Sequence, residues 1–219
     1  MITAYFISGL GADEKIFQRL QLPPGFEPYY INWIEPLKNE LFHEYAQRLA
    51  QIINRDKDFI LIGVSMGGMM AIEISKFLQP KCTVQISSTL NKNGLPLLTR
   101  IAGKLPISNL VSEKMLHSDL VHNYHYLGTK SKEDIELVKS MIRNTSITFF
   151  RWAVSGIVRW ENDFVPGNLV RIHGTKDRII PFSKDKDVIP VQNGTHFMVY
   201  NRANEINKIL EEKLPKTAK

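Results

Sequence analysis

Short apolar runs alternate along the chain with longer stretches in which apolar residues recur at helical spacing. The clearest runs are Ile2 to Ile7 and Phe59 to Val64, and their nearly unbroken apolar character is typical of strands buried on both faces. Shorter runs with the composition of strands cover residues 29–33, 83–87, 169–173 and 187–191. Strands that alternate with helices predict an α/β fold with a mostly parallel sheet and helices on both of its faces.

Several stretches between and after these runs have the apolar periodicity of amphipathic helices. Asn39 is a plausible N-cap for one of them, and Ser131 for another, with Asp134 at the capping-box position. The stripes consist of Leu41, Tyr45, Leu49 and Ile52; Met70, Ile74, Phe77 and Leu78; Ile135, Val138, Met141 and Ile142; Ile147, Phe150, Val154 and Ile157; and Ile206, Leu210 and Leu214.

The strand rhythm is interrupted between Thr89 and about Asn162, where no strand pattern is found. We predict a helical lid or cap over residues 90–162, inserted into a single domain that spans residues 1–219. Because apolar insertions near a reactive loop often line ligand pockets, we expect Phe149, Phe150 and Trp152 to line a substrate pocket. The alternative is that these aromatic side chains form the core of the insertion itself.

Composition narrows the class of protein. The chain has 219 residues, of which 43% are hydrophobic and 23% charged, as in an ordinary globular domain. No apolar run approaches the ~20 residues of a membrane span, and the N-terminus lacks the pattern of a signal peptide. The single cysteine, Cys82, excludes an internal disulfide, so we expect a buried thiol and a cytoplasmic protein.

The net charge of +6 hints at an anionic substrate or partner. Lys and Arg are mixed with Asp and Glu along the chain, however, and no nucleic-acid recognition motif accompanies them. We therefore expect a small-molecule substrate, no nucleic acid, and a monomer or homodimer.

The sequence Gly63-Val-Ser-Met-Gly67 lies between an apolar strand and an amphipathic helix. A serine on such a sharp turn exposes its hydroxyl above the sheet, and the flanking glycines avoid collisions within the turn. The amide of Met66, at the start of the helix, can stabilise an oxyanion. Ser65 is therefore a candidate nucleophile.

A second glycine-containing loop, Ser8-Gly-Leu-Gly-Ala-Asp13, follows the first strand. A dinucleotide-binding G-x-G-x-x-G would need glycine where Glu14 stands, so that interpretation fails. The loop can instead present a backbone amide, that of Leu10, to the group that Ser65 attacks. A simple strand-to-helix turn is compatible with this role.

Asp177 and His196 follow two later strands, and the carboxyl ends of parallel strands share one edge of a sheet. A serine hydroxyl needs a nearby base, which in turn needs a carboxylate to hold its tautomer. Three other carboxylates also lie between the serine and the histidine. We favour Asp177 because it follows Gly174 on a loop after a clear strand, unlike Asp163, Asp185 and Asp187.

These motifs, with His173-Gly-Thr-Lys-Asp177 and Gly194-Thr-His-Phe197, resemble those of the α/β-hydrolase superfamily, in its serine-nucleophile esterase and lipase-like branch. The resemblance covers nearly the whole chain. It implies Ser65 as nucleophile, His196 as general base and then acid, Asp177 as orienting carboxylate, and the amides of Leu10 and Met66 as the oxyanion hole. It also implies a sheet of about six strands, since two strands usual in the family are missing.

The resemblance implies a serine hydrolase that cleaves a carboxylic ester or thioester through an acyl-enzyme, without a cofactor. Acyl transfer, C–C hydrolysis, perhydrolysis and non-catalytic binding on the same fold remain alternatives. We expect no metal, because the histidines at 117, 122 and 125 have no cysteine or ligand motif beside them.

Overall fold

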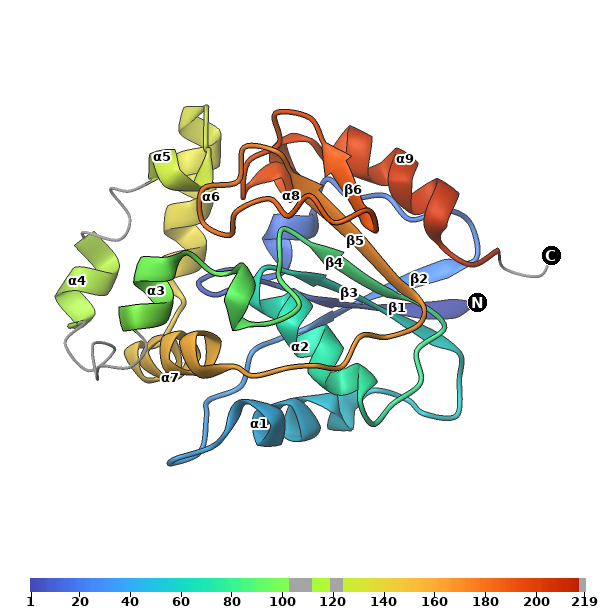
Figure 1. The fold of residues 1–219 in the computed structure, drawn as a ribbon, viewed down its shortest axis with the longest axis horizontal. Helices are drawn as coiled ribbons and strands as arrows, with labels where there is room; N and C mark the ends of the chain where they lie inside the picture. The colour runs from blue at the N-terminus through green and yellow to red at the C-terminus, as the bar shows by residue number, and fades with distance from the viewer. Residues whose placement is uncertain (103–111, 119–123, 217–219) are drawn as a thin grey trace.

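The computed structural model describes residues 1–102, 112–118 and 124–216. Its strands form one six-stranded sheet in the order β2-β1-β3-β4-β5-β6, and every neighbouring pair is parallel (Figure 1). This confirms the predicted α/β fold and the predicted number of strands. The strands are β1 (Ile2–Ile7), β2 (Phe26–Ile31), β3 (Phe59–Val64), β4 (Thr83–Ile86), β5 (Leu169–Gly174) and β6 (Val188–Val191).

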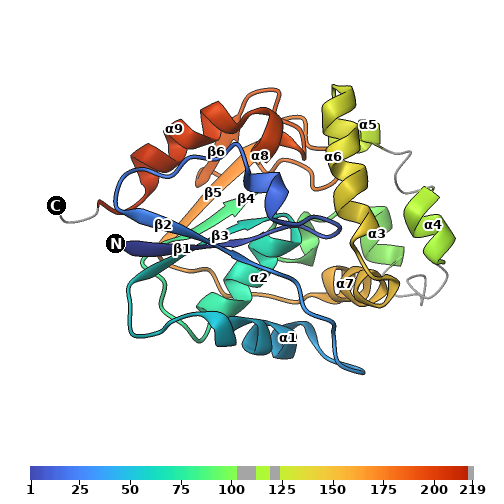
Figure 2. The same cartoon turned by 180° about the vertical axis from the view of Figure 1, so that it is seen from behind.

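Helices cover both faces of the sheet, as Figures 1 and 2 show from opposite sides. The α-helices are α1 (Phe42–Leu49), α2 (Met66–Ser75), α3 (Leu97–Ala102), α4 (Glu113–Ser118), α5 (Tyr124–Leu127), α6 (Lys132–Arg143), α7 (Ile147–Arg159), α8 (Met198–Asn201) and α9 (Ala203–Lys213). Short 3-10 helices are η1 (Glu14–Phe17), η2 (Ala50–Ile52) and η3 (Lys92–Gly94).

The alternation of side chains along the central strands produces two hydrophobic cores. Tyr5 and Ile7 of β1 pack with α1, α2 and α7, whereas Phe6 packs on the opposite face with α6, α8 and α9. In β3, likewise, Leu61 belongs to the first core and Ile62 to the second. The near-continuous apolar runs of β1 and β3 are explained by this two-sided burial.

The described residues between β4 and β5 form helices joined by loops and include no strand. Helices α3 to α7 gather beyond the carboxyl ends of the strands in both views (Figures 1 and 2). Helix α6 begins at the predicted N-cap, where Ser131 accepts from the amide of Asp134 and Asp134 accepts from the amide of Ser131.

Two local predictions need correction. Strand β2 covers Phe26–Ile31 rather than residues 29–33, because it is the edge strand and its middle residues are exposed, which weakens the apolar pattern. The N-cap of α1 is Leu41, whose amide donates to the Glu44 carboxylate at 2.8 Å. Asn39 lies in a preceding turn with a φ of 60°.

Candidate active site

Ser65 occupies a strained turn between β3 and α2. Its φ of 55° and ψ of −121° lie outside the regions that non-glycine residues usually adopt. The flanking glycines have steric reasons to be there. A Cβ on Gly63 would lie 2.2 Å from the Gly67 carbonyl oxygen, and one on Gly67 would lie 2.0 Å from that of Ile7. The tight packing of β1, β3 and α2 thus holds the serine above the sheet.

The structure brings the three predicted side chains together at the carboxyl edge of the sheet. The Ser65 hydroxyl lies 3.0 Å from Nε2 of His196, and Nδ1 of His196 lies 2.8 Å from Oδ2 of Asp177. The loops after β5 and β6 are held against each other, since a Cβ on Gly174 would lie 2.4 Å from the Gly194 carbonyl. Their contact fixes the spacing between the carboxylate and the imidazole.

The Asp177 carboxylate is fully enclosed, with 0% of its side chain exposed. Its Oδ1 accepts hydrogen bonds from the amides of Ile179 and Ile180, at 2.9 and 3.0 Å. Burial alone would raise the pKa of this carboxyl, but the charge of His196 and hydrogen bonds from His173 and His196 outweigh it and hold the pKa well below its usual range. Asp177 therefore stays ionised beside the imidazole.

A second histidine, for which the motifs predicted no role of its own, contacts the same carboxylate. Nε2 of His173, buried in β5, lies 2.9 Å from the Ile180 carbonyl and 3.3 Å from Oδ2 of Asp177. Because a carbonyl only accepts, this nitrogen carries the hydrogen. The available signal was its place at the end of a strand, four residues before the aspartate.

The competing carboxylates have other partners or positions. Asp185 and Asp187 lie 3.2 and 2.9 Å from the guanidinium of Arg171, a residue of β5. Asp163 precedes β5 and lines a separate surface depression with Asn91 and Glu161. Of the carboxylates considered from the sequence, Asp177 is the one that the structure places against His196.

Ser65 and His196 open into a cavity of about 460 Å³ between the sheet edge and the helical segment. Its other described lining residues are mostly apolar and include no Lys, Arg, Asp or Glu. Leu10 and Met66, the expected oxyanion-hole residues, both line it, and Met66 is the first residue of α2, so its amide has no partner within the helix. The apolar walls include Leu95, Leu116, Val138, Met141, Phe150 and Ile157.

Only one of the three predicted pocket aromatics lines this cavity. Phe150 does. Phe149, also in α7, is instead buried in the hydrophobic core, and Trp152 stacks on Phe42 with a ring-centroid distance of 5.9 Å. Neighbouring positions on a helix face different directions, so residues 149 and 152 turn toward α1. For these two the alternative of a packing role holds.

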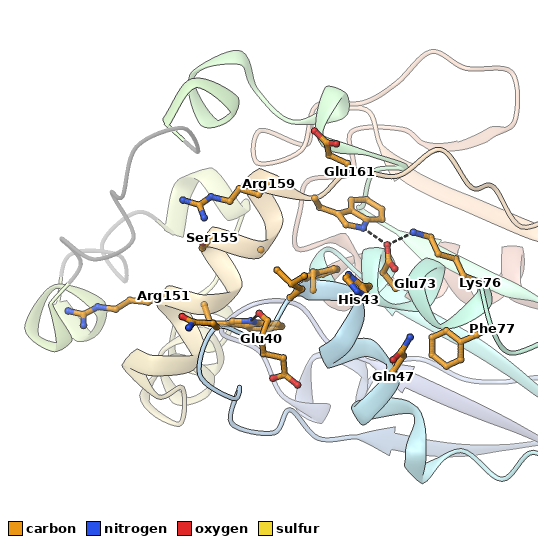
Figure 3. A pocket seen from close by; sticks show the side chains of 16 residues that line it. Glu40, His43, Gln47, Glu73, Lys76, Phe77, Arg151, Ser155, Arg159 and Glu161 are labelled. Carbon is orange, nitrogen blue, oxygen red and sulfur yellow. Dashed lines mark hydrogen bonds and ion pairs between the residues drawn. The ribbon is translucent and has the colours of Figure 1, made fainter.

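Trp152 lines instead a larger cavity, of about 1020 Å³, between α1, α2 and α7, shown in Figure 3. We call it the α1–α7 groove. Within it the buried Glu73 carboxylate accepts from Nε1 of Trp160 and from Nζ of Lys76, both at 2.6 Å. Since neither Ser65 nor His196 lines this groove, its size does not make it the reactive site.

The remaining expectations concern metals, thiols and membranes. The described residues contain no cluster of three or more His, Cys, Asp or Glu side chains arranged for a metal, but residue 122 and the side chain of residue 117 lie outside them. Cys82 is buried, which raises the pKa of its thiol to about 11. No helix in the described part of the chain is long and apolar enough to cross a membrane.

Comparison with known proteins places the fold. No protein-family model matches the chain, and no curated protein matches its sequence. Among solved structures it is similar to a hydrolase from Oleispira antarctica (14% identity, 97% of this chain and 90% of that chain covered, TM-score 0.75). It is also similar to a malate-bound esterase from Thermogutta terrifontis (13% identity, 97% of this chain and 89% of that chain covered, TM-score 0.73). A third similar structure is a bromoperoxidase from Bacillus anthracis (15% identity, 97% of this chain and 91% of that chain covered, TM-score 0.74).

The chain thus has the fold of the α/β-hydrolase superfamily, as the motifs predicted. Identities of 13–15% show the fold alone and do not define the reaction, which depends on the residues of the site.

Proposed function

We propose that this protein is a serine hydrolase that cleaves carboxylic esters or thioesters through an acyl-enzyme on Ser65. The observation that carries the proposal is the unbroken line of contacts from Ser65 through His196 to Asp177, at 3.0 and 2.8 Å, at the edge of an apolar cavity. A hydroxyl, an imidazole and a buried ionised carboxylate in this order form the arrangement that activates a serine. A protein that only bound a ligand would not require all three.

In the proposed reaction, the Ser65 oxygen attacks the carbonyl carbon while Nε2 of His196 takes the hydroxyl proton. The amides of Leu10 and Met66 stabilise the resulting oxyanion. His196 then returns the proton to the leaving alcohol or thiol, the bond to that group breaks, and the acyl group stays on Ser65. Water, deprotonated by His196, attacks the acyl-enzyme, and its collapse releases the acid and restores the serine.

The chemistry of the cavity supports an uncharged, apolar acyl group. Its volume of about 460 Å³ suits a small molecule. No Lys or Arg side chain lines it among the described residues, so an anionic acyl group would lose its hydration without gaining a counter-ion from one of these residues. The net positive charge of the chain therefore does not define this substrate. Because residues 95, 116 and 126 of the helical segment line the cavity, we propose that residues 90–162 act as its lid.

A comparison of two chromogenic esters tests the substrate class. We expect p-nitrophenyl octanoate to be hydrolysed with a kcat/KM roughly a hundredfold above that of the anionic p-nitrophenyl hemisuccinate, because the buried carboxylate would lack a partner. The ratio should vary little with salt concentration, since no Lys or Arg is found among the lining residues that the structure describes. Equal rates, or a preference for the anionic ester, would contradict the apolar assignment.

A further inference from the structure

The loop that carries Leu10 separates two cavities. Gly9 and Leu10 line the cavity with Ser65, whereas Ser8 and Trp33 line a smaller cavity of about 170 Å³ behind the loop. A Cβ on Gly9 would lie 3.2 Å from Cβ of Ser65, so the loop passes directly against the serine. Whichever peptide groups of this loop face Ser65 decide whether an oxyanion can be stabilised there.

The orientation of one peptide group is fixed from behind. The indole N–H of Trp33 donates to the carbonyl oxygen of Gly9 at 3.3 Å, and the amide of Ala12 donates to the same oxygen at 3.1 Å. The Ser8 hydroxyl adds a bond of 2.8 Å to the Ala12 carbonyl. Gly11, at a φ of 71°, completes the turn between these bonds.

The carbonyl of Gly9 and the amide of Leu10 belong to the same planar peptide, in which C=O and N–H point in opposite directions. A donor behind the loop that holds the carbonyl therefore aims the Leu10 N–H forward, to the side that Ser65 occupies. We propose that Trp33 is a positioning residue for the oxyanion hole, acting through the Gly9–Leu10 peptide. This inference rests on the proposed serine-hydrolase function, and it assigns a role to a residue outside the three reacting side chains.

The chain offers a matched control for this role. Trp152 is, like Trp33, half-buried and in ring contact with Tyr45 and Phe149. Its indole also donates to a backbone carbonyl, that of Glu40, at 2.8 Å. The two tryptophans differ in the carbonyl to which they donate. Trp33 donates to Gly9, in the loop beside Ser65, whereas Trp152 donates to Glu40, which lines the α1–α7 groove.

The test compares Trp33→Phe with Trp152→Phe. Deleting a whole oxyanion donor costs about 10²–10³ in kcat, and the Ala12 amide still holds Gly9 in the variant, so we expect Trp33→Phe to lower kcat about tenfold. KM for p-nitrophenyl octanoate should change less than about twofold, because an interaction made only in the transition state is weakened. The affinity for an alkyl boronic acid, which forms a tetrahedral anion on the serine, should fall by the same factor as kcat. Trp152→Phe should leave kcat and the boronic acid affinity unchanged.

A second variant separates the hydrogen bond from packing. Benzothienyl-alanine at position 33 keeps the shape of tryptophan but replaces its N–H with sulfur, and it should reproduce the loss in kcat with an unaltered melting temperature. If both position-33 variants match Trp152→Phe, or raise KM without lowering kcat, the role of Trp33 is contradicted while the hydrolase function stands. An inert wild type, which neither hydrolyses esters nor binds the boronic acid, would overturn both.

Discussion

At the scale of single residues, the site depends on how Asp177 is enclosed. Its carboxylate has no exposed surface, accepts two backbone amides through Oδ1, and contacts two histidines through Oδ2. Because its pKa is held well below the usual range, the carboxylate is ionised at every pH at which His196 can act as a base. It can then hold one tautomer of the imidazole throughout that range.

We predict that Asp177→Asn lowers kcat by roughly 10⁴, because the amide would hold the imidazole in the wrong tautomer. The loss should be similar at every pH above about 5, since the wild-type carboxyl does not titrate there. Steady-state rates of ester hydrolysis across that range measure both effects.

Asp187→Asn is the matched control. Its carboxylate lies 2.9 Å from the Arg171 guanidinium, at the amino end of β6, whereas Asp177 follows the carboxyl end of β5 and contacts His196. This variant should keep kcat within about twofold, because Asp187 is far from the reacting side chains in the sheet and the buried Arg171 keeps Asp185 as a partner. A large loss in Asp187→Asn or in Asp163→Asn, with Asp177→Asn active, would mean that the orienting acid has been misassigned.

Residue identities could be predicted where motif and local structure coincide. Ser65, Asp177 and His196 each follow a strand recognisable from its apolar run, so their meeting at one edge follows from the parallel sheet. His173 was part of the motif that ends at Asp177 but was given no role of its own, and Trp33 was not predicted as part of the site. Their contacts, to Asp177 and to Gly9, depend on how neighbouring loops pack, and no periodicity in the sequence reports that packing.

At the scale of elements, the junction of β1, β3 and α2 positions Ser65, the proposed nucleophile. Gly67 lies in the first turn of α2, directly against the end of β1. Intrinsic propensity alone would make alanine in a helix more favourable than glycine by about 1 kcal/mol. Here a Cβ would approach the carbonyl oxygens of Ile7 and Ser8 to 2.0 and 2.4 Å, which only a backbone shift could relieve.

We therefore predict that Gly67→Ala lowers the free energy of unfolding by about 3 kcal/mol, the opposite sign to propensity. Urea denaturation of the purified variant measures this loss. In Gly167→Ala the added Cβ meets nothing within 4 Å, so stability should be unchanged or slightly raised. A Gly67→Ala variant as stable as the wild type would show that β1 and α2 are not packed this closely.

The elements that were predicted least well are those in which burial does not produce a regular pattern of apolar residues. The sequence predicted β1, β3, β4 and β5 to within one residue at each end. Burial on both faces leaves a nearly continuous apolar run in β1 and β3, whereas β4 and β5 also contain polar residues. Edge strand β2 is half solvated, and its predicted start was three residues too late. For α7 the amphipathic pattern was predicted correctly. Some of its apolar side chains pack with α1 and others line the cavity, and the periodicity does not tell which side chain does which.

At the scale of the whole molecule, function would arise where three structures meet. The carboxyl edge of the sheet supplies Ser65, Asp177 and His196, the first loop supplies Leu10, and the helical segment between β4 and β5 supplies about half of the apolar wall. The larger α1–α7 groove is separate: neither Ser65 nor His196 lines it, and its buried Glu73 carboxylate accepts hydrogen bonds from Trp160 and Lys76.

Labelling with a fluorophosphonate, followed by intact-mass measurement, tests whether Ser65 is an activated nucleophile. The wild type should gain a single adduct, as should Ser155→Ala, which removes a hydroxyl from the α1–α7 groove. Ser65→Ala should fold normally and gain none. Labelling of Ser65→Ala to the same extent, or no adduct on folded wild-type protein, would contradict the account.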